Sequence, residues 1–356
     1  MNKNRIIKTL LLLVILLLPS FDITARNNQI IEITETLKNI LKEYETVVPF
    51  NNGYIRVSKD RKQGLLDSSG KEILAPKYDH IGNFSNGLAL VNKIENEIWN
   101  IEYGYINSLG EEVIPCIYEF AADFKEELAL IYDGKDLHYI NTDGNIVFTC
   151  YYDDAKSFSC GLARVKHQGL NGYINKKGEL VIPFNYQWAS DFKENLAIVQ
   201  KDREFMIINI HGEIINSLNY DDIEDFSNGL ARVKKDGKCG YINTNGEEVI
   251  PCQYSSADTF VDGVAVISID KKSGLINTSG EILFLGDYDV IKEVGNGMAV
   301  VVKNHKHGFI NLKGEEIVPC KYFIAGGFCE SGVAMVVDEN ANSGLVDKNG
   351  NVTFFY

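Results

Sequence analysis

The chain of 356 residues is short of positive charge. It has 35 lysine and arginine residues against 49 aspartate and glutamate residues, which gives a formal net charge of -14. Because affinity for nucleic acids comes largely from lysine and arginine on phosphates, this balance argues against a nucleic-acid partner. An acidic surface also repels anionic membranes and suits cationic partners. Tryptophan is scarce as well, since only Trp99 and Trp188 are present.

Long hydrophobic runs are missing apart from one near the N-terminus. Lys3, Arg5 and Lys8 precede the apolar run 10–18, and Pro19 and Ser20 then lead to a small residue at Ala25. The run is about half the length that a membrane-spanning helix needs. The pattern predicts a secretory signal peptide over residues 1–25 that is cleaved after Ala25. We therefore expect an exported protein (periplasmic, cell-surface or secreted) with no integral membrane span once the signal is removed.

Seven cysteines in an exported chain raise the question of disulfides. Four of them lie six residues after the glycine of a hairpin and so share one strand position: Cys116, Cys150, Cys252 and Cys320. A small side chain in a repeated buried position is the favoured interpretation. Bridges of Cys150 with Cys160 and of Cys320 with Cys329 stay open as alternatives.

An internal repeat dominates the rest of the sequence. Each copy reads Phe-x-x-Gly-Leu-Ala-x-Val, a variable polar loop, then Gly-Tyr-Ile-Asn-x-x-Gly-Glu-x-Val-Ile-Pro-x-x-Tyr, and residues 226–254 are the clearest copy. Nine copies begin near residues 50, 84, 124, 158, 192, 226, 260, 294 and 328. The spacing is uniform, at about 34 residues, except for one longer step. That step contains an insertion at 94–102, which carries Trp99.

The composition of each copy predicts β-strands. Three short apolar runs, rich in β-branched and aromatic residues, are separated by turn residues. Sequences such as Asn243 to Gly246 predict a hairpin with a bulge, in which glycine adopts a left-handed conformation and asparagine bonds to its own turn. A proline follows the third run in several copies and indicates a strand end, an edge or a bulge there: Pro115, Pro183, Pro251 and Pro319.

The sequence also has a second period of about 68 residues, twice the length of one copy. Copies with the proline alternate with copies that lack it, apart from Pro76 in the first. The hairpin glycines of the proline copies are Gly110, Gly178, Gly246 and Gly314. The intervening copies carry a Tyr-Asp pair instead, at residues 78–79, 152–153, 220–221 and 288–289. The repeating element is therefore predicted to be a module of two copies.

These patterns predict an all-β tandem array of nine three-stranded units over residues 50–356. An open superhelical solenoid is favoured over a closed β-propeller, because the number of copies is odd and a copy of about 34 residues is short for a four-stranded blade. Residues 26–49 precede the array and are expected to form an N-terminal amphipathic helix that caps it, with a linker as the alternative. The apolar residues at helical spacing are Ile33, Leu37, Ile40, Leu41 and Tyr44.

The repeat resembles the WG-containing repeats of bacterial surface and secreted proteins. The match rests on Gly-Tyr-Ile-Asn followed by Gly-Glu-x-Val-Ile-Pro and then Phe-x-x-Gly-Leu-Ala-x-Val, and it covers residues 50–356. The tryptophan that precedes the glycine in that family is replaced here, for example by Gln63, Tyr103, Asn171, Cys239, Ser273, His307 and Ser343. The resemblance implies a β-repeat array with a binding role, and it brings no catalytic residues.

Three repeated or paired features are possible sites. The aspartates of the Tyr-Asp pairs, Asp79, Asp153, Asp221 and Asp289, could bind Ca²⁺ as a stripe, but turn capping is favoured. The aromatic residues Tyr105, Tyr173, Tyr241 and Phe309 share one position, which favours core packing over a ligand face. His305 and His307 lack further metal ligands nearby and are expected to be exposed loop residues. No metal, cofactor or catalytic residue is predicted.

Function is expected to lie in residues that break the repeat. Trp99 and Trp188 are the candidate binding residues, because neither recurs from copy to copy. We expect an exported, non-catalytic binding or scaffold protein that presents an acidic, loop-lined surface to a protein or glycan partner. The alternative is an extracytoplasmic hydrolase that acts on carbohydrate or peptide through its non-repeated loops.

Overall fold

The computed structural model describes residues 43–49, 54–67, 70–95, 100–328 and 333–355. Within these ranges the chain consists of strands and turns, with nine four-stranded sheets and no helix. The predicted signal peptide lies outside the described residues, as does most of the predicted N-terminal helix. The end of that predicted cap is a strand instead, at Thr46–Pro49.

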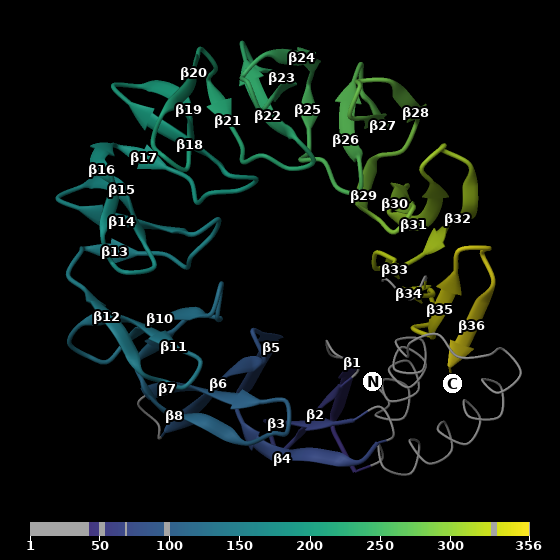
Figure 1. Cartoon of the computed structure of the whole chain (residues 1–356). Coiled ribbons are helices and arrows are strands. Elements are labelled where there is room, and N and C mark those ends of the chain that lie inside the picture. The colour runs from purple at the N-terminus through teal and green to yellow at the C-terminus, as the bar shows by residue number, and fades with distance from the viewer. Residues whose placement is uncertain (1–42, 50–53, 68–69, 96–99, 329–332, 356) are drawn as a thin grey trace, which may run out of the picture. The chain divides into compact units, whose positions relative to one another are not determined.

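The chain divides into two units, of which the first runs to Tyr151 and the second from Tyr152 to Thr353. The N-terminal unit contains three sheets (Figure 1). Sheet A has β1 (Thr46–Pro49), β2 (Ile55–Lys59), β3 (Lys62–Leu66) and β4 (Glu72–Tyr78); sheet B has β5 (His80–Ser85), β6 (Leu88–Glu95), β7 (Asn100–Asn107) and β8 (Glu112–Tyr118); sheet C has β9 (Phe120–Ala121), β10 (Leu128–Tyr132), β11 (Leu137–Asn141) and β12 (Ile146–Cys150).

Six sheets follow. Sheet D has β13 (Asp154–Ala155), β14 (Leu162–His167), β15 (Leu170–Asn175) and β16 (Leu180–Tyr186); sheet E has β17 (Trp188–Ala189), β18 (Leu196–Lys201), β19 (Glu204–Asn209) and β20 (Ile214–Leu218). Sheet F has β21 (Asp222–Ile223), β22 (Leu230–Lys235), β23 (Lys238–Asn243) and β24 (Glu248–Tyr254); sheet G has β25 (Ser256–Ala257), β26 (Val264–Ile269), β27 (Lys272–Asn277) and β28 (Ile282–Gly286). Sheet H has β29 (Val290–Gly295), β30 (Met298–Lys303), β31 (Lys306–Asn311) and β32 (Glu316–Tyr322); sheet I has β33 (Ile324–Ala325), β34 (Val333–Val337), β35 (Ser343–Asp347) and β36 (Val352–Phe355).

Every sheet is an open antiparallel meander in which the strand order follows the sequence. The predicted three-stranded unit is therefore wrong by one strand. The additional strand is the first of each sheet, and in sheets C to G and in sheet I it is only two residues long. A strand of that length is too short to show the alternation of apolar and polar side chains by which a strand is recognised in a sequence.

Tight turns join the first and second strands. In sheet F, Asn228 and Gly229 have φ of 54° and 76°, as a type I′ turn requires. The turn between the third and fourth strands is the predicted bulged hairpin. The Asn243 side-chain oxygen accepts hydrogen bonds from the amides of Asn245 and Glu247, Gly246 has φ of 78°, and the register shifts nearby. The prediction for this turn is confirmed.

The repeated prolines lie in the last strand of their sheets, within a β-bulge. Pro251 is in β24, the last strand of sheet F, so its missing amide faces no neighbouring strand. Tyr241 pairs with Ile250 while Cys239 pairs with Tyr254, so residues 251–253 bulge opposite Gly240. The same register shift recurs in sheets B, D and H. The two backbones lie close together at this glycine, where a Cβ would be 2.5 Å from the Ile250 carbonyl oxygen.

The repeated aromatic position is core, as predicted. Tyr241 is fully buried and its ring lies 4.7 Å from the buried ring of Phe260 in sheet G. Its hydroxyl donates a hydrogen bond of 2.6 Å to the Asp258 carbonyl oxygen. Two further tyrosines bind the backbone of the next sheet in the same way, Tyr105 to Ala122 and Tyr173 to Ser190.

Contacts between successive sheets explain why the sequence alternates from one copy to the next. One kind of junction joins sheet A to B and sheet E to F, where the tyrosine of the Tyr-Asp pair donates to a glutamate of the next sheet, as Tyr78 does to Glu112 at 2.6 Å and Tyr220 to Glu248 at 3.5 Å. The other kind joins B to C, D to E and F to G. There a serine hydroxyl donates to the carbonyl oxygen of the buried phenylalanine in the next sheet, through Ser85, Ser159 and Ser227. The two kinds of junction therefore follow the two-copy period of the sequence.

The aspartates of the Tyr-Asp pairs cap turns. One oxygen of Asp221 accepts a hydrogen bond of 2.8 Å from the Asp236 amide, which lies in the turn between β22 and β23. Asp153 and Asp289 accept equivalent bonds from Gln168 and Asn304. Asp79 likewise accepts a bond from the Ile94 amide and also pairs with Lys62, so the favoured interpretation of these residues is confirmed.

The cysteines behave as small core residues. Cys116 and Cys150 are buried, and Cys252 and Cys320 are partly buried. Burial raises the pKa of the Cys116 and Cys252 thiols to about 11. Cys160 carries a free thiol, so the bridge that it could have formed is absent, and Cys329 lies outside the described residues.

No helix among the described residues combines the length and the apolar character needed to cross a membrane.

Candidate functional site

Trp188 is an exposed aromatic residue at the start of sheet E. It forms the short strand β17 with Ala189, which is buried, so the alternation of a strand turns the indole outward. The side chain is 43 % exposed and contacts Phe205 edge to face, with ring centroids 6.3 Å apart. Trp99, the other predicted candidate, lies outside the described residues.

Trp188 lines a groove of about 480 Å³ that involves sheets E, F and G. Lys193 comes from sheet E, Glu224 and Asp225 from the loop after β21 in sheet F, and Thr259 from the loop after β25 in sheet G. All three contributions come from the segment between the first and second strands of a sheet. The groove therefore follows one loop position through three consecutive copies.

The repeat dictates which residues of these loops are accessible. In sheets E to G each segment reads a small or apolar residue, two variable residues, then phenylalanine, whereas sheet H has Val294 in the last position. In sheet F, Ile223 and Phe226 are buried at its two ends. The two variable positions between them stay accessible. In sheets E to H they include a carboxylate in every copy: Asp191, Glu224, Asp225, Asp258 and Glu293. Sequence reasoning missed this series, although acidic residues just before the phenylalanine of successive copies are a readable signal.

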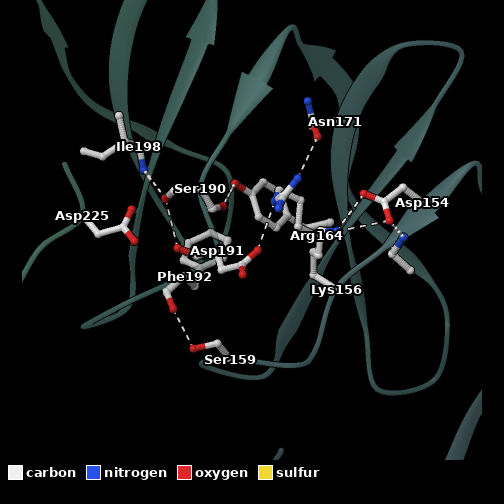
Figure 2. Close-up of polar contacts among 12 residues, drawn as sticks. Asp154, Lys156, Ser159, Arg164, Asn171, Ser190, Asp191, Phe192, Ile198 and Asp225 are labelled. Atoms are coloured by element: carbon white, nitrogen blue, oxygen red, sulfur yellow. Dashed lines mark hydrogen bonds and ion pairs between the residues drawn. The ribbon is translucent and has the colours of Figure 1, made fainter. Parts of the chain in front are cut away.

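Arg164 pairs with the first member of the series (Figure 2). Its Nε donates to Asp191 at 3.0 Å, and its Nη1 donates to the Asn171 side-chain oxygen at 3.3 Å. Asn171 is buried, stands where the resembled repeats have tryptophan, and donates to the carbonyl oxygens of Tyr186 and Gln187. The guanidinium of Arg164 thus contacts an amide side chain that stands at the position of the family's tryptophan.

Arg232 lies two copies further on and is the equivalent residue of sheet F. Its Nη2 donates to Asp222 at 3.1 Å and also to Glu224, and its Nη1 lies 3.6 Å from the Cys239 sulfur. The hydroxyl of Thr259 in sheet G donates to the second oxygen of Glu224 at 3.0 Å. Glu224 therefore joins sheets F and G across the groove.

The pKa values of Glu224 and Asp258 are shifted in opposite directions. The hydrogen bond from Arg232 lowers the pKa of Glu224, and the bond from Thr259 adds to the effect against partial burial. Desolvation of its carboxylate, and then the charge of Glu224, raise the pKa of Asp258, while the charge of Arg232 acts in the opposite direction. Glu224 is thus the better-stabilised anion of the pair.

Replacing Arg232 by methionine is expected to raise the pKa of Glu224 and to lower stability by about 1 kcal/mol at neutral pH, because a charge-assisted hydrogen bond between partly exposed groups is lost. In the native chain the lowered pKa contributes stability above the unfolded pKa of Glu224, and this contribution is lost as the pH falls through the folded pKa. The variant should show a weaker dependence in that acidic range. Urea unfolding at several pH values measures it, with Lys238→Met as the control; equal behaviour of both variants contradicts the prediction.

Lys193 and Asp225 form an ion pair inside the groove. The Lys193 ammonium lies 3.0 Å from the Asp225 carboxylate, and the lysine side chain is 56 % exposed against 33 % for the aspartate. Lys193 immediately precedes the turn between the first and second strands of sheet E, whereas Asp225 belongs to sheet F. The pair thus places a cation beside the same groove that Trp188 lines.

Neither predicted histidine, His305 or His307, lines the groove. His305 is exposed in a turn, but His307 lies partly buried in β31, so the prediction of two loop residues is wrong for His307 because the strand begins at Lys306. His138 is buried in sheet C, 3.0 Å from Thr149 Oγ1 and 3.2 Å from Asp133 Oδ2. Among the described ranges, no three His, Cys, Asp or Glu residues are grouped as a metal site would require.

The likeness to solved structures concerns the fold. A eukaryotic initiation factor crystal structure matches with a TM-score of 0.55 at 10 % identity, over 84 % of this chain and 95 % of that one. Hsv2 of Kluyveromyces lactis gives 0.38 at 9 % identity over 66 % and 98 %, and the WD40 domain of Neurospora crassa Pan2 gives 0.30 at 13 % identity over 56 % and 76 %. At 10 % identity the first of these shows a likeness of fold alone. None of the curated proteins compared with the chain matches it.

The sequence itself matches the WG containing repeat nine times. The matched residues are 35–62, 64–95, 103–135, 139–170, 172–203, 205–239, 240–272, 274–306 and 308–340. These stretches make up most of the chain and agree in number with the nine copies and the nine sheets. The predicted resemblance is confirmed, and the chain belongs to the WG containing repeat family.

Proposed function

We propose that this chain is an exported binding protein that holds a cationic segment of a partner protein against the loops of sheets E, F and G. The observation that carries the proposal is the groove beside Trp188, which is built from three consecutive copies and in which an exposed indole lies with the carboxylates of Glu224 and Asp225. Repeat β-folds of this kind serve binding or scaffolding in general. The partner class and the export of the chain are the parts that experiment must decide.

Electrostatics favour a cationic partner. Carboxylates occupy the accessible loop positions of four successive sheets, whereas the nearby cations Arg164, Lys193 and Arg232 are each paired with one of them. The whole chain carries a net charge of -14, so long-range attraction would speed the approach of a basic segment. An exposed tryptophan face attracts lysine and arginine through its quadrupole.

A direct test uses a fluorescein-labelled peptide of alternating arginine and glycine, measured by fluorescence anisotropy at low and physiological salt. Neutralising four carboxylates together, by Asp191→Asn, Glu224→Gln, Asp225→Asn and Asp258→Asn, is expected to weaken binding by about tenfold or more, since each exposed ion pair contributes at most ~1 kcal/mol. The loss should shrink at high salt because exposed charges are screened.

The control removes the same charge elsewhere. The bulged hairpins of sheets E to H each carry a glutamate whose side chain accepts a bond from the asparagine of its own turn: Glu213, Glu247, Glu281 and Glu315. Changing these four to glutamine alters the net charge equally but leaves the groove intact. If both quadruple variants lose the same affinity, binding follows total charge and the groove has no special role.

The alternative of an extracytoplasmic hydrolase has one observation in its favour. The pKa values of Glu224 and Asp258 are pushed apart, as in pairs that divide the roles of base and acid. Glu224 lines the groove, but Asp258 is not among its lining residues. Chromogenic glycoside and peptide substrates test this alternative, and it requires turnover that Glu224→Gln and Asp258→Asn each abolish.

Export has its own test. If the signal peptide is cleaved as proposed, intact mass of the chain recovered from outside the cytoplasm should correspond to a start at Arg26. Recovery of the uncleaved chain from the cytoplasm alone would contradict export without affecting the groove.

A further inference from the structure

The ion pair of Lys193 and Asp225 lies where an external cation would bind. Both residues line the groove beside Trp188, and the ammonium is 3.0 Å from the carboxylate. The two members differ in how firmly they are held. Asp225 immediately precedes Phe226, which is 2 % exposed, whereas the long Lys193 side chain is more than half exposed.

We propose that Lys193 occupies a subsite for the terminal cation of a partner's arginine side chain, and that the arginine displaces it on binding. The inference rests on the proposed function and names the group that the groove recognises. Exposed pairs of this kind contribute about 0–1 kcal/mol, so little stability is lost when the lysine leaves. Asp225 would then accept the guanidinium, with Trp188 beside it.

Arginine fits this subsite better than lysine. A guanidinium is planar, can bind a carboxylate through two parallel hydrogen bonds and stacks on aromatic faces, whereas an ammonium is a compact point charge. Trp188 and Asp225 present one group of each kind in the same groove. A lysine peptide would compete with Lys193 on equal terms, but an arginine peptide gains the stacking and the second hydrogen bond.

The loop that carries Asp225 is held in place before any ligand arrives. The hydroxyl of Ser227 donates to the Phe260 carbonyl oxygen at 2.8 Å, and Glu224 is bound by Arg232 and Thr259. Both neighbours of Asp225 in the chain, Glu224 and Phe226, are therefore fixed to the rest of the sheet or to the next one. A pre-positioned carboxylate loses less freedom on binding than a mobile one.

The test is whether one substitution raises or lowers the affinity for the peptide. Lys193→Met keeps the apolar stem but removes the internal competitor, and it is expected to raise affinity for the arginine–glycine peptide by about two- to fivefold. Asp225→Asn should lower affinity to a similar degree, and Lys193→Met should give no gain when Asp225→Asn is already present. Peptides in which lysine or citrulline replaces arginine should gain less or nothing.

Lys156→Met is the matched control, because Lys156 is paired with Asp154 at 3.1 Å in sheet D and lies outside the groove. Equal gains from Lys193→Met and Lys156→Met, or equal binding of the citrulline peptide, would overturn the subsite. If the quadruple carboxylate variant still weakens binding in that case, the proposed function survives without the subsite. Lys193→Gln, checked for an unchanged melting curve, guards against a folding artefact of the methionine variant.

Discussion

Phe260→Ala is expected to lower the free energy of unfolding by about 3–5 kcal/mol, the range for truncation of a buried aromatic residue. The Phe260 ring is 1 % exposed, packs on Tyr241 of sheet F and belongs to a core cluster shared by sheets F and G. Its loss therefore leaves a cavity between two sheets. The hydrogen bond from Ser227 to the Phe260 backbone can still form but then joins less well-packed loops.

Urea unfolding followed by tryptophan fluorescence measures this effect. Trp188 and Phe260 line the same groove, so the indole should report the opening of this junction. Val261→Ala is the control, because Val261 is the next residue and is 46 % exposed. Similar losses in both variants would show that the junction between sheets F and G is not closely packed.

Gly240→Ala is expected to cost about 1–3 kcal/mol through overpacking. A Cβ at this position would lie 2.5 Å from the Ile250 carbonyl oxygen and 2.7 Å from the Cys252 amide nitrogen. Both are backbone atoms of β24, so the strands must separate rather than a side chain move. Met206 occupies the same repeat position in sheet E, where it pairs directly with Ser217 and a side chain is accommodated.

Gly295→Ala is the matched control for this substitution. Gly295 is also in a strand, and a Cβ there would meet no atom within 4 Å. Alanine should be neutral or stabilise by up to about 1 kcal/mol, because it restricts the unfolded chain. Thermal unfolding that places both variants on the same side of the native chain would contradict the steric account.

Much of the fold could be predicted because the same local sequence patterns recur from copy to copy. The asparagine and glycine of the bulged hairpin, the proline at an edge and the buried aromatic position all act over short stretches of sequence, which sequence patterns register. The first strand of each sheet escaped because residues such as Ser256 and Ala257 form a strand only by pairing with β26. Its existence depends on a partner strand, not on its own composition.

The candidate site could be predicted less completely. Trp188 stands out in the sequence because it does not recur, and the structure places it at a groove. Its neighbours were missed because Lys193 and Asp225 lie in different copies and meet only through the packing of sheet E on sheet F. The Tyr-Asp aspartates are the more conspicuous pattern in the sequence, yet Asp221 is occupied by a turn amide.

The alternation of two junctions bears on how such a chain can grow or shrink. Loss of two adjacent copies would leave a tyrosine–glutamate junction followed by a serine–phenylalanine junction, whereas loss of a single copy would bring together two sheets whose bonding groups do not correspond. Duplication or deletion of copies within the gene is therefore expected to add or remove sheets in pairs. Relatives that differ in length are expected to differ by an even number of copies.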